Sequence, residues 1–146
     1  VYGPRGRNFL LTVLRLARER KELKVVNDQY GAPTPARLIA EATACIVARL
    51  SWHAHLDAER LEGIGGLYHL TSAGRATWYE FAQEILRGSR AAPKVTPITT
   101  AEYPSPARRP RNSVLDNGKL RQAFGIELPD WKTGLKLCLE ELEEQG

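Results

Sequence analysis

The strongest constraint on the fold is the ratio of helical to strand patterns. Five segments repeat apolar residues at helical spacings, but only residues 23–26 and 66–70 have strand character. Nearby prolines restrict residues 95–98 to edge-type extended structure. Two short strands cannot form a sheet that buries five helices. We therefore predict an α/β, mainly helical chain with a few short strands, in which residues 67–70 belong to a sheet whose other strands lie outside this chain.

Each predicted helix has a start signal. Asn, Thr and Asp side chains can accept hydrogen bonds from free backbone amides at a helix N-terminus, and proline suits the first helical position. A Thr followed three residues later by Glu forms a capping box. On these grounds the helices are expected to begin after Asn8, Thr34, Thr77, Asp116 and Pro129-Asp130.

Composition indicates one globular domain over residues 1–146, with residues 51–65 as a variable surface excursion. No apolar run is long enough to span a membrane, so we expect a cytoplasmic protein. Cys45 and Cys138 fall in helical patterns and are expected to be reduced core thiols. A net charge of +4 does not by itself imply nucleic-acid binding. Because the chain opens on Val-Tyr-Gly-Pro and has no Met, we expect a fragment of a longer protein, although processing could produce the same start.

Three segments could bind a ligand. Residues 3–9 lead into a helix N-terminus, which favours an anion, although an ordinary capped helix has the same pattern. Residues 28–34 place polar groups on a proline-stiffened loop, which turn formation alone would also explain. Arg108, Arg109 and Arg111 lie on a segment with two prolines, and their guanidinium groups could bind a diphosphate or simply be solvated.

Two other patterns do not support a site. His53 and His55 lack a clear third ligand, so a chance surface pair is favoured over a metal site. Residues 63–66 are rich in glycine but precede a predicted strand, which is the wrong order for a dinucleotide-binding turn. We therefore expect neither a metal site nor a cofactor-binding motif within the chain.

Several motifs together resemble one enzyme family. They are Val1-Tyr2-Gly3, the segment from Asn8 to Ala17, the segment from Val25 to Thr34 with its Asp-Gln-x-Gly-x-Pro-Thr, Gly66 to Leu70, Thr77-Trp78, Tyr103 to Ser113 with its Ala-Arg-Arg-Pro, and Leu128-Pro129-Asp130-Trp131. In order and spacing the chain resembles the second half of dTDP-4-dehydrorhamnose reductases. The resemblance covers nearly all of the chain except about residues 51–65.

The resemblance implies the C-terminal substrate-binding part of an extended short-chain dehydrogenase/reductase. Such an enzyme reduces dTDP-4-dehydro-L-rhamnose to dTDP-L-rhamnose with NADPH or NADH, held mainly by an N-terminal Rossmann domain that would be absent here. The family's catalytic Tyr-x-x-x-Lys pair is also missing, since none of the five tyrosines has Lys four residues later. The fragment alone should therefore be inactive.

The resemblance also implies roles for individual residues. Asn8, Phe9 and Gln29 would contact the nucleotide-sugar, Arg108 and Arg109 would meet its diphosphate, and Tyr2 would lie near the junction of cofactor and sugar. The partner is thus a dTDP-sugar, with no nucleic acid and no membrane; a homodimer and strand pairing between fragments stay open.

Three alternatives remain at this stage. One is a non-catalytic reductase-like regulatory subunit, as in the β-subunit of methionine adenosyltransferase, and another is a different nucleotide-sugar reductase or epimerase of the same family. The third, a basic nucleic-acid-binding module, is disfavoured because no aromatic residues alternate with the arginines.

Overall fold

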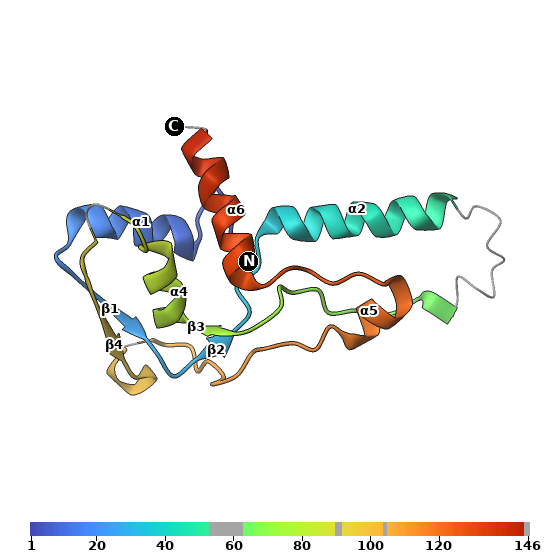
Figure 1. Ribbon diagram of the computed structural model, residues 1–146. Helices are drawn as coiled ribbons and strands as arrows, with labels where there is room; N and C mark the ends of the chain where they lie inside the picture. Colours follow the sequence, from blue (N-terminus) through green and yellow to red (C-terminus); the bar gives the residue numbers. More distant parts are fainter. Residues whose placement is uncertain (53–62, 90–91, 104, 145–146) are drawn as a thin grey trace.

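The computed structural model describes residues 1–52, 63–89, 92–103 and 105–144 (Figure 1). Its elements are, in chain order, α1 (Phe9–Glu19), β1 (Glu22–Val26), β2 (Tyr30–Gly31), α2 (Ala36–Trp52), β3 (Ala76–Thr77), α4 (Trp78–Ile85), β4 (Lys94–Ile98), η1 (Thr100–Glu102), α5 (Gly118–Phe124) and α6 (Trp131–Glu144). The prediction of a mainly helical chain with a few short strands is confirmed.

Two of the predicted caps are present. The Asn8 side-chain oxygen accepts from the Leu11 amide at 3.1 Å, which fixes the start of α1. At α4 the Thr77 hydroxyl accepts from the Glu80 amide, and the Glu80 carboxylate accepts from the Thr77 amide, forming the expected capping box. Both helices therefore begin where local sequence signals predict.

Two other predicted starts differ from the structure, whereas α6 begins at Trp131, directly after Pro129-Asp130 as predicted. The Thr34 hydroxyl donates to the Ala32 carbonyl and accepts from the Ser72 amide, so it ties two loops together instead of capping α2. Helix α5 begins at Gly118 with Asn117 in the cap position, one residue beyond the predicted Asp116. Its predicted end is correct, because Gly125 closes the helix in the left-handed conformation with φ 61°.

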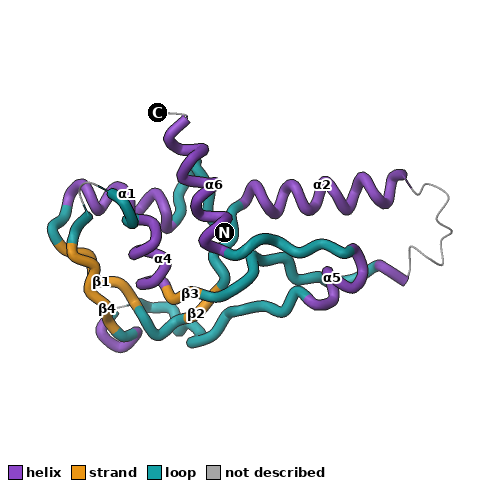
Figure 2. The backbone as a smooth tube through the Cα atoms, viewed as in Figure 1, coloured by secondary structure: helices purple, strands orange, loops and turns teal. Residues whose placement is uncertain are grey.

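The strands form two small pairs (Figure 2). β1 runs parallel to β4, with Glu22 opposite Lys94 and Val26 opposite Ile98, whereas β2 pairs antiparallel with β3 over two residues. The predicted strand at residues 66–70 is wrong. The chain there pairs with no described strand, and Leu67 is 81% exposed. A strand forms only where a neighbouring segment can hydrogen-bond to its backbone.

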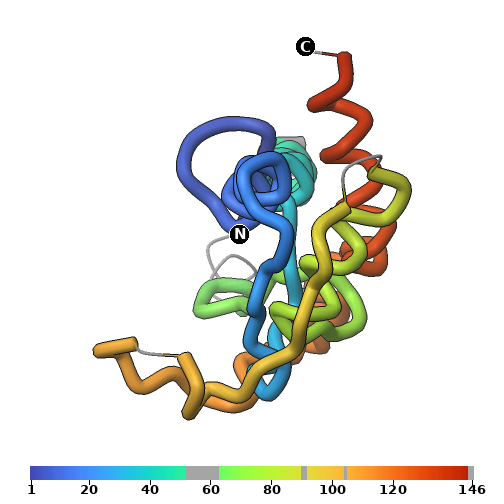
Figure 3. The backbone as a smooth tube through the Cα atoms, turned by 90° about the vertical axis from the view of Figure 1, so that its left-hand side faces the viewer, coloured from blue at the N-terminus to red at the C-terminus, as the bar shows by residue number. Residues whose placement is uncertain are grey.

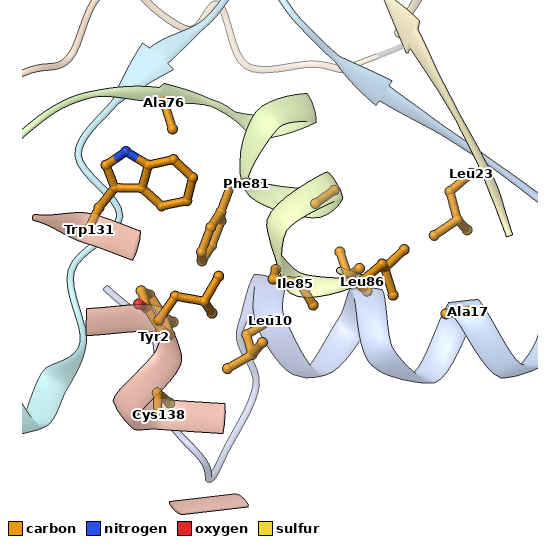
Figure 4. Packing of buried hydrophobic residues seen from close by; sticks show 13 residues of the cluster. Tyr2, Leu10, Ala17, Leu23, Ala76, Phe81, Ile85, Leu86, Trp131 and Cys138 are labelled. Carbon is orange, nitrogen blue, oxygen red and sulfur yellow. The ribbon is translucent and has the colours of Figure 1, made fainter. Parts of the chain in front are cut away.

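The core lies between α1, α4 and α6 and extends along α1 and α4 to Leu23 of β1 (Figure 4). Phe81 of α4 is 2% exposed and packs against Tyr2, Phe9 and Trp131, with ring centroids 5.0, 5.6 and 6.0 Å away. Leu10 from α1 and Leu135 from α6 fill the space beside it. One aromatic side chain thus joins the helices to the opening segment of the chain.

Helix α2 projects away from this core, above α5 and the loops around it (Figure 1). Among its apolar residues Ala42 is buried, whereas Val47 is 55% exposed. Cys45 is exposed, so the expectation of a core thiol is wrong there and correct for the buried Cys138. Within the described ranges, no helix has both the length and the hydropathy of a membrane span.

Candidate functional site

The opening segment of the chain is held as an extra strand beside the loop that precedes α2. The Tyr2 amide donates to the Thr34 carbonyl at 3.1 Å, and the Ala36 amide donates to the Tyr2 carbonyl at 2.8 Å. Tyr2 is consequently 4% exposed, and its ring lies against Phe81. These bonds place Tyr2 at the inner end of the candidate site.

The arginine-rich segment reaches the site through backbone hydrogen bonds to β2. The Tyr30 amide donates to the Arg111 carbonyl at 2.8 Å, and the Ser113 amide donates to the Tyr30 carbonyl at 2.9 Å. In Figure 3 residues 99–103 and 105–110 extend sideways from the lower end of the molecule. The tether at Tyr30 brings Arg109 and Pro110 back toward the helices.

Two cavities open where these segments meet. The first, of about 370 Å³, is lined by Tyr2, Phe81, Thr77, the loop at residues 29–33 and Arg109. The second, of about 530 Å³, lies between α1, β1 and residues 100–103 and 105–109, with Thr12, Leu16 and Tyr103 on its walls. Both volumes fall in the range that small-molecule sites occupy.

The two cavities share four lining residues, Phe9, Gln29, Trp78 and Arg109. They therefore form a two-part cleft with a common boundary, and the boundary carries one guanidinium group, one amide and two aromatic rings. Phe9 and Trp78 contact each other, with ring centroids 4.7 Å apart. Such a cleft fits an elongated ligand whose negative charge lies near its middle.

Gln29 is the most constrained polar residue at this boundary. It is 9% exposed, accepts a hydrogen bond from the Trp78 indole nitrogen at 3.3 Å, and donates from Nε2 to the Thr100 hydroxyl at 3.1 Å. The Thr100 hydroxyl in turn donates to Asp28, and this bond, opposed by partial desolvation, holds the pKa of the Asp28 carboxyl below its ordinary value. Two residues distant in sequence, Trp78 and Thr100, thus hold the Gln29 amide, and the adjacent Asp28 holds Thr100.

Of the six site residues predicted from the sequence, only some lie at the cleft. Tyr2, Phe9, Gln29 and Arg109 line the cleft, whereas Asn8 and Arg108 line neither cavity. The amide of Asn8 donates to the Gly3 and Arg5 carbonyls while its oxygen caps α1, so its hydrogen bonds stabilise the turn. Arg109 is exposed, and in the described part of the chain no ion pair engages its guanidinium.

Tyr2 presents its ring to the cleft and buries its hydroxyl. Among the described residues no partner bonds this hydroxyl. Burial, reinforced by Cys138, raises the pKa of Tyr2 above its ordinary value. The contribution of Tyr2 to the cavity wall is therefore apolar, and its phenol faces α6.

A family model described as the RmlD substrate binding domain matches residues 1–144. The chain belongs to the RmlD substrate binding domain family. Its Burkholderia thailandensis relative, named dTDP-4-dehydrorhamnose reductase, is 48% identical over 157 aligned residues, covering 99% of this chain and 50% of that protein. This RmlD substrate binding domain thus spans about half the length of the curated relatives it matches.

Solved structures agree with this assignment. A Clostridium acetobutylicum dTDP-4-dehydrorhamnose reductase superposes with a TM-score of 0.80 at 37% identity, covering 94% of this chain and 45% of that one. A Bacillus anthracis dTDP-4-dehydrorhamnose reductase in complex with NADP gives 0.78 at 31% identity, covering 96% and 45%. The expected resemblance to the second half of these reductases is confirmed.

Several cleft residues were not predicted from the sequence. Trp78 and Thr100 hold Gln29, yet they lie 49 and 71 positions from it. Thr77 was predicted only as a cap, but its hydroxyl also donates to Asn27, and the residue lines the first cavity. His53 and His55, for which a metal site was rejected, lie outside the described residues.

Proposed function

We propose that this chain is the substrate-binding part of a dTDP-4-dehydrorhamnose reductase, which reduces dTDP-4-dehydro-L-rhamnose to dTDP-L-rhamnose with NADPH. One observation carries the proposal: the two cavities meet at Arg109. A nucleotide-sugar has the matching layout, with a sugar and a nucleoside on either side of a charged diphosphate. Relatives at 48% and 45% identity bear this reductase's name, so the regulatory-subunit and epimerase alternatives are not favoured.

In this proposal the diphosphate lies against Arg109, since a planar guanidinium can donate two parallel hydrogen bonds to phosphate oxygens. The sugar occupies the cavity beside Tyr2 and Thr77, and the nucleoside occupies the cavity beside Thr12 and Tyr103. Phe9 and Trp78 close the boundary with apolar rings. Arg108 and Asn8 act less directly, Arg108 through the local positive charge and Asn8 by fixing the turn before Phe9.

The described residues do not fit a site for NADPH. β1 is followed by Asn27, Asp28 and Gln29 instead of a glycine-rich turn into a helix, which is what the pyrophosphate of a dinucleotide needs. The relative solved with NADP is about twice as long as this chain. We therefore assign cofactor binding and hydride delivery to the part of the protein outside this chain.

We also propose a cytoplasmic location and an inactive isolated chain. Cys45 and Cys138 are both free, as expected in a reducing compartment. The chain lacks the Tyr-x-x-x-Lys pair that its resemblance to the family requires. Reduction of the keto sugar should therefore be measurable only with the complete protein.

The test is dTDP binding by isothermal titration calorimetry to the complete protein and its Arg109→Ala variant. A charge-assisted hydrogen bond contributes about 1.5–3 kcal/mol, so we expect affinity to fall roughly 10- to 150-fold. Arg121→Ala is the control, because Arg121 is an exposed arginine on α5 that pairs with Glu127 and lines neither cavity. An Arg109→Ala affinity within about twofold of wild type would refute the diphosphate role.

A further inference from the structure

The hydrogen bonds around Gln29 determine which end of its amide faces each neighbour. The Trp78 indole nitrogen can only donate, so the group 3.3 Å from it must be the amide oxygen. The Thr100 hydroxyl gives its single proton to Asp28, so it must accept from the amide nitrogen 3.1 Å away. Two independent neighbours therefore select the same orientation of the amide.

In this orientation the Gln29 amide keeps one N–H that can donate a hydrogen bond toward the cleft. A primary amide has two N–H groups, and among the described residues only Thr100 takes one of them. Gln29 lines both cavities, so its small exposed fraction faces the cleft. A free glutamine loses roughly 1.5–2 kcal/mol of side-chain entropy when it is ordered. Here much of that cost is met before any ligand arrives.

We propose that Trp78 and Thr100 are positioning residues for Gln29, holding its amide so that the remaining N–H donates to an acceptor oxygen of the bound nucleotide. This inference rests on the proposed function, because it takes the ligand to be a nucleoside diphosphate. Asp28 acts indirectly: it accepts the Thr100 hydroxyl proton, which leaves the Thr100 oxygen free to accept from Gln29. Trp78 also lines the cleft directly, so its two contributions have to be separated by experiment.

Single substitutions give the first measurement, using dTDP binding to the complete protein. Trp78→Phe keeps an aromatic ring beside Phe9 but removes the indole N–H together with part of the ring system, whereas Thr100→Val removes the hydroxyl that Gln29 needs. We expect each to weaken dTDP binding about threefold to tenfold, the range of one neutral hydrogen bond. Thr100→Ser retains the hydroxyl and should restore most of the affinity lost in Thr100→Val.

The decisive measurement repeats both substitutions in a Gln29→Ala background. If Trp78 and Thr100 act through Gln29, neither should lower affinity further by more than about twofold, because the group they hold is gone. Equal losses in both backgrounds, or no loss in either, would overturn the proposal. Tyr79→Phe is the control, since the Tyr79 hydroxyl bonds Gln83 on the same helix.

The outcomes separate this inference from the proposed function. If the wild-type protein fails to bind dTDP, the proposed function itself is wrong. If it binds dTDP and depends on Arg109, but Trp78 and Thr100 contribute independently of Gln29, only the positioning inference is wrong. Urea unfolding of every variant verifies that a lost affinity does not reflect a lost fold.

Discussion

Two leucines allow the same substitution to be compared in opposite surroundings. Leu10 is 0% exposed beneath α4, whereas Leu67 is 81% exposed in the segment where the sequence predicted a strand. Truncating a buried leucine removes transfer free energy and leaves a cavity, at a cost of about 3–5 kcal/mol. An exposed leucine in no special geometry should cost at most about 0.5 kcal/mol. We expect Leu10→Ala to be destabilising by at least about 2.5 kcal/mol more than Leu67→Ala.

Urea unfolding followed by circular dichroism at 222 nm gives both free energies. With a slope of about 2 kcal/mol per molar urea, Leu10→Ala should lower the midpoint by roughly 1.5–2.5 M and Leu67→Ala by less than about 0.3 M. Unchanged slopes would show that the native and unfolded states are otherwise comparable. A loss at Leu67 equal to that at Leu10 would mean that residues 66–70 are covered, and the description of this segment as unpaired would be wrong.

Further predictions concern a buried phenol, a helix cap and an open sheet edge. Because folding raises the pKa of Tyr2, its contribution to stability is complete below the ordinary tyrosine pKa of about 10 and falls by about 1.4 kcal/mol per pH unit above it. Tyr2→Phe should remove that share of the alkaline slope in urea unfolding, and an unchanged slope would contradict the burial of the hydroxyl. Thr77→Ala should cost about 1–2 kcal/mol in the same assay, since it removes a cap and leaves Asn27 without its bond; a loss below about 0.3 kcal/mol would refute the cap. The isolated chain should self-associate through the edges of the β1–β4 pair, giving concentration-dependent sedimentation, and a strictly monomeric chain would count against this.

The elements that could be predicted from sequence are those with local causes. α1 and α4 are specified by Asn8 and by the Thr77–Glu80 box together with an apolar stripe, so neighbours within one turn decide them. β1 follows from a short β-branched run. The predicted strand at 66–70 failed because a strand also needs a partner, and β3 pairs instead with β2, where Thr77 lies opposite Tyr30 from 47 positions away.

Some residues of the candidate site could likewise be predicted from the sequence, and others could not. Arg109, Gln29 and Phe9 lie in segments whose residue types suggest anion or polar-ligand contacts, whereas the expectation for Tyr2 came from the family resemblance alone, and the structure brings all four to one cleft. Asn8 was predicted both as a cap and as a ligand contact, but its side-chain amide donates hydrogen bonds to the carbonyls of Gly3 and Arg5. The bonds that orient Gln29 could not be predicted, because they depend on the folded distance between segments and not on any spacing along the chain.

The separation of the cleft from the projecting α2 has a practical consequence. None of the residues lining the two cavities comes from α2 or α5. Cys45 lies on this outlying helix, exposed, whereas burial raises the pKa of the Cys138 thiol and keeps it inert. Of the two cysteines in this chain, a maleimide dye should therefore attach at Cys45 and not at Cys138, giving a spectroscopic reporter outside the residues that line the cleft.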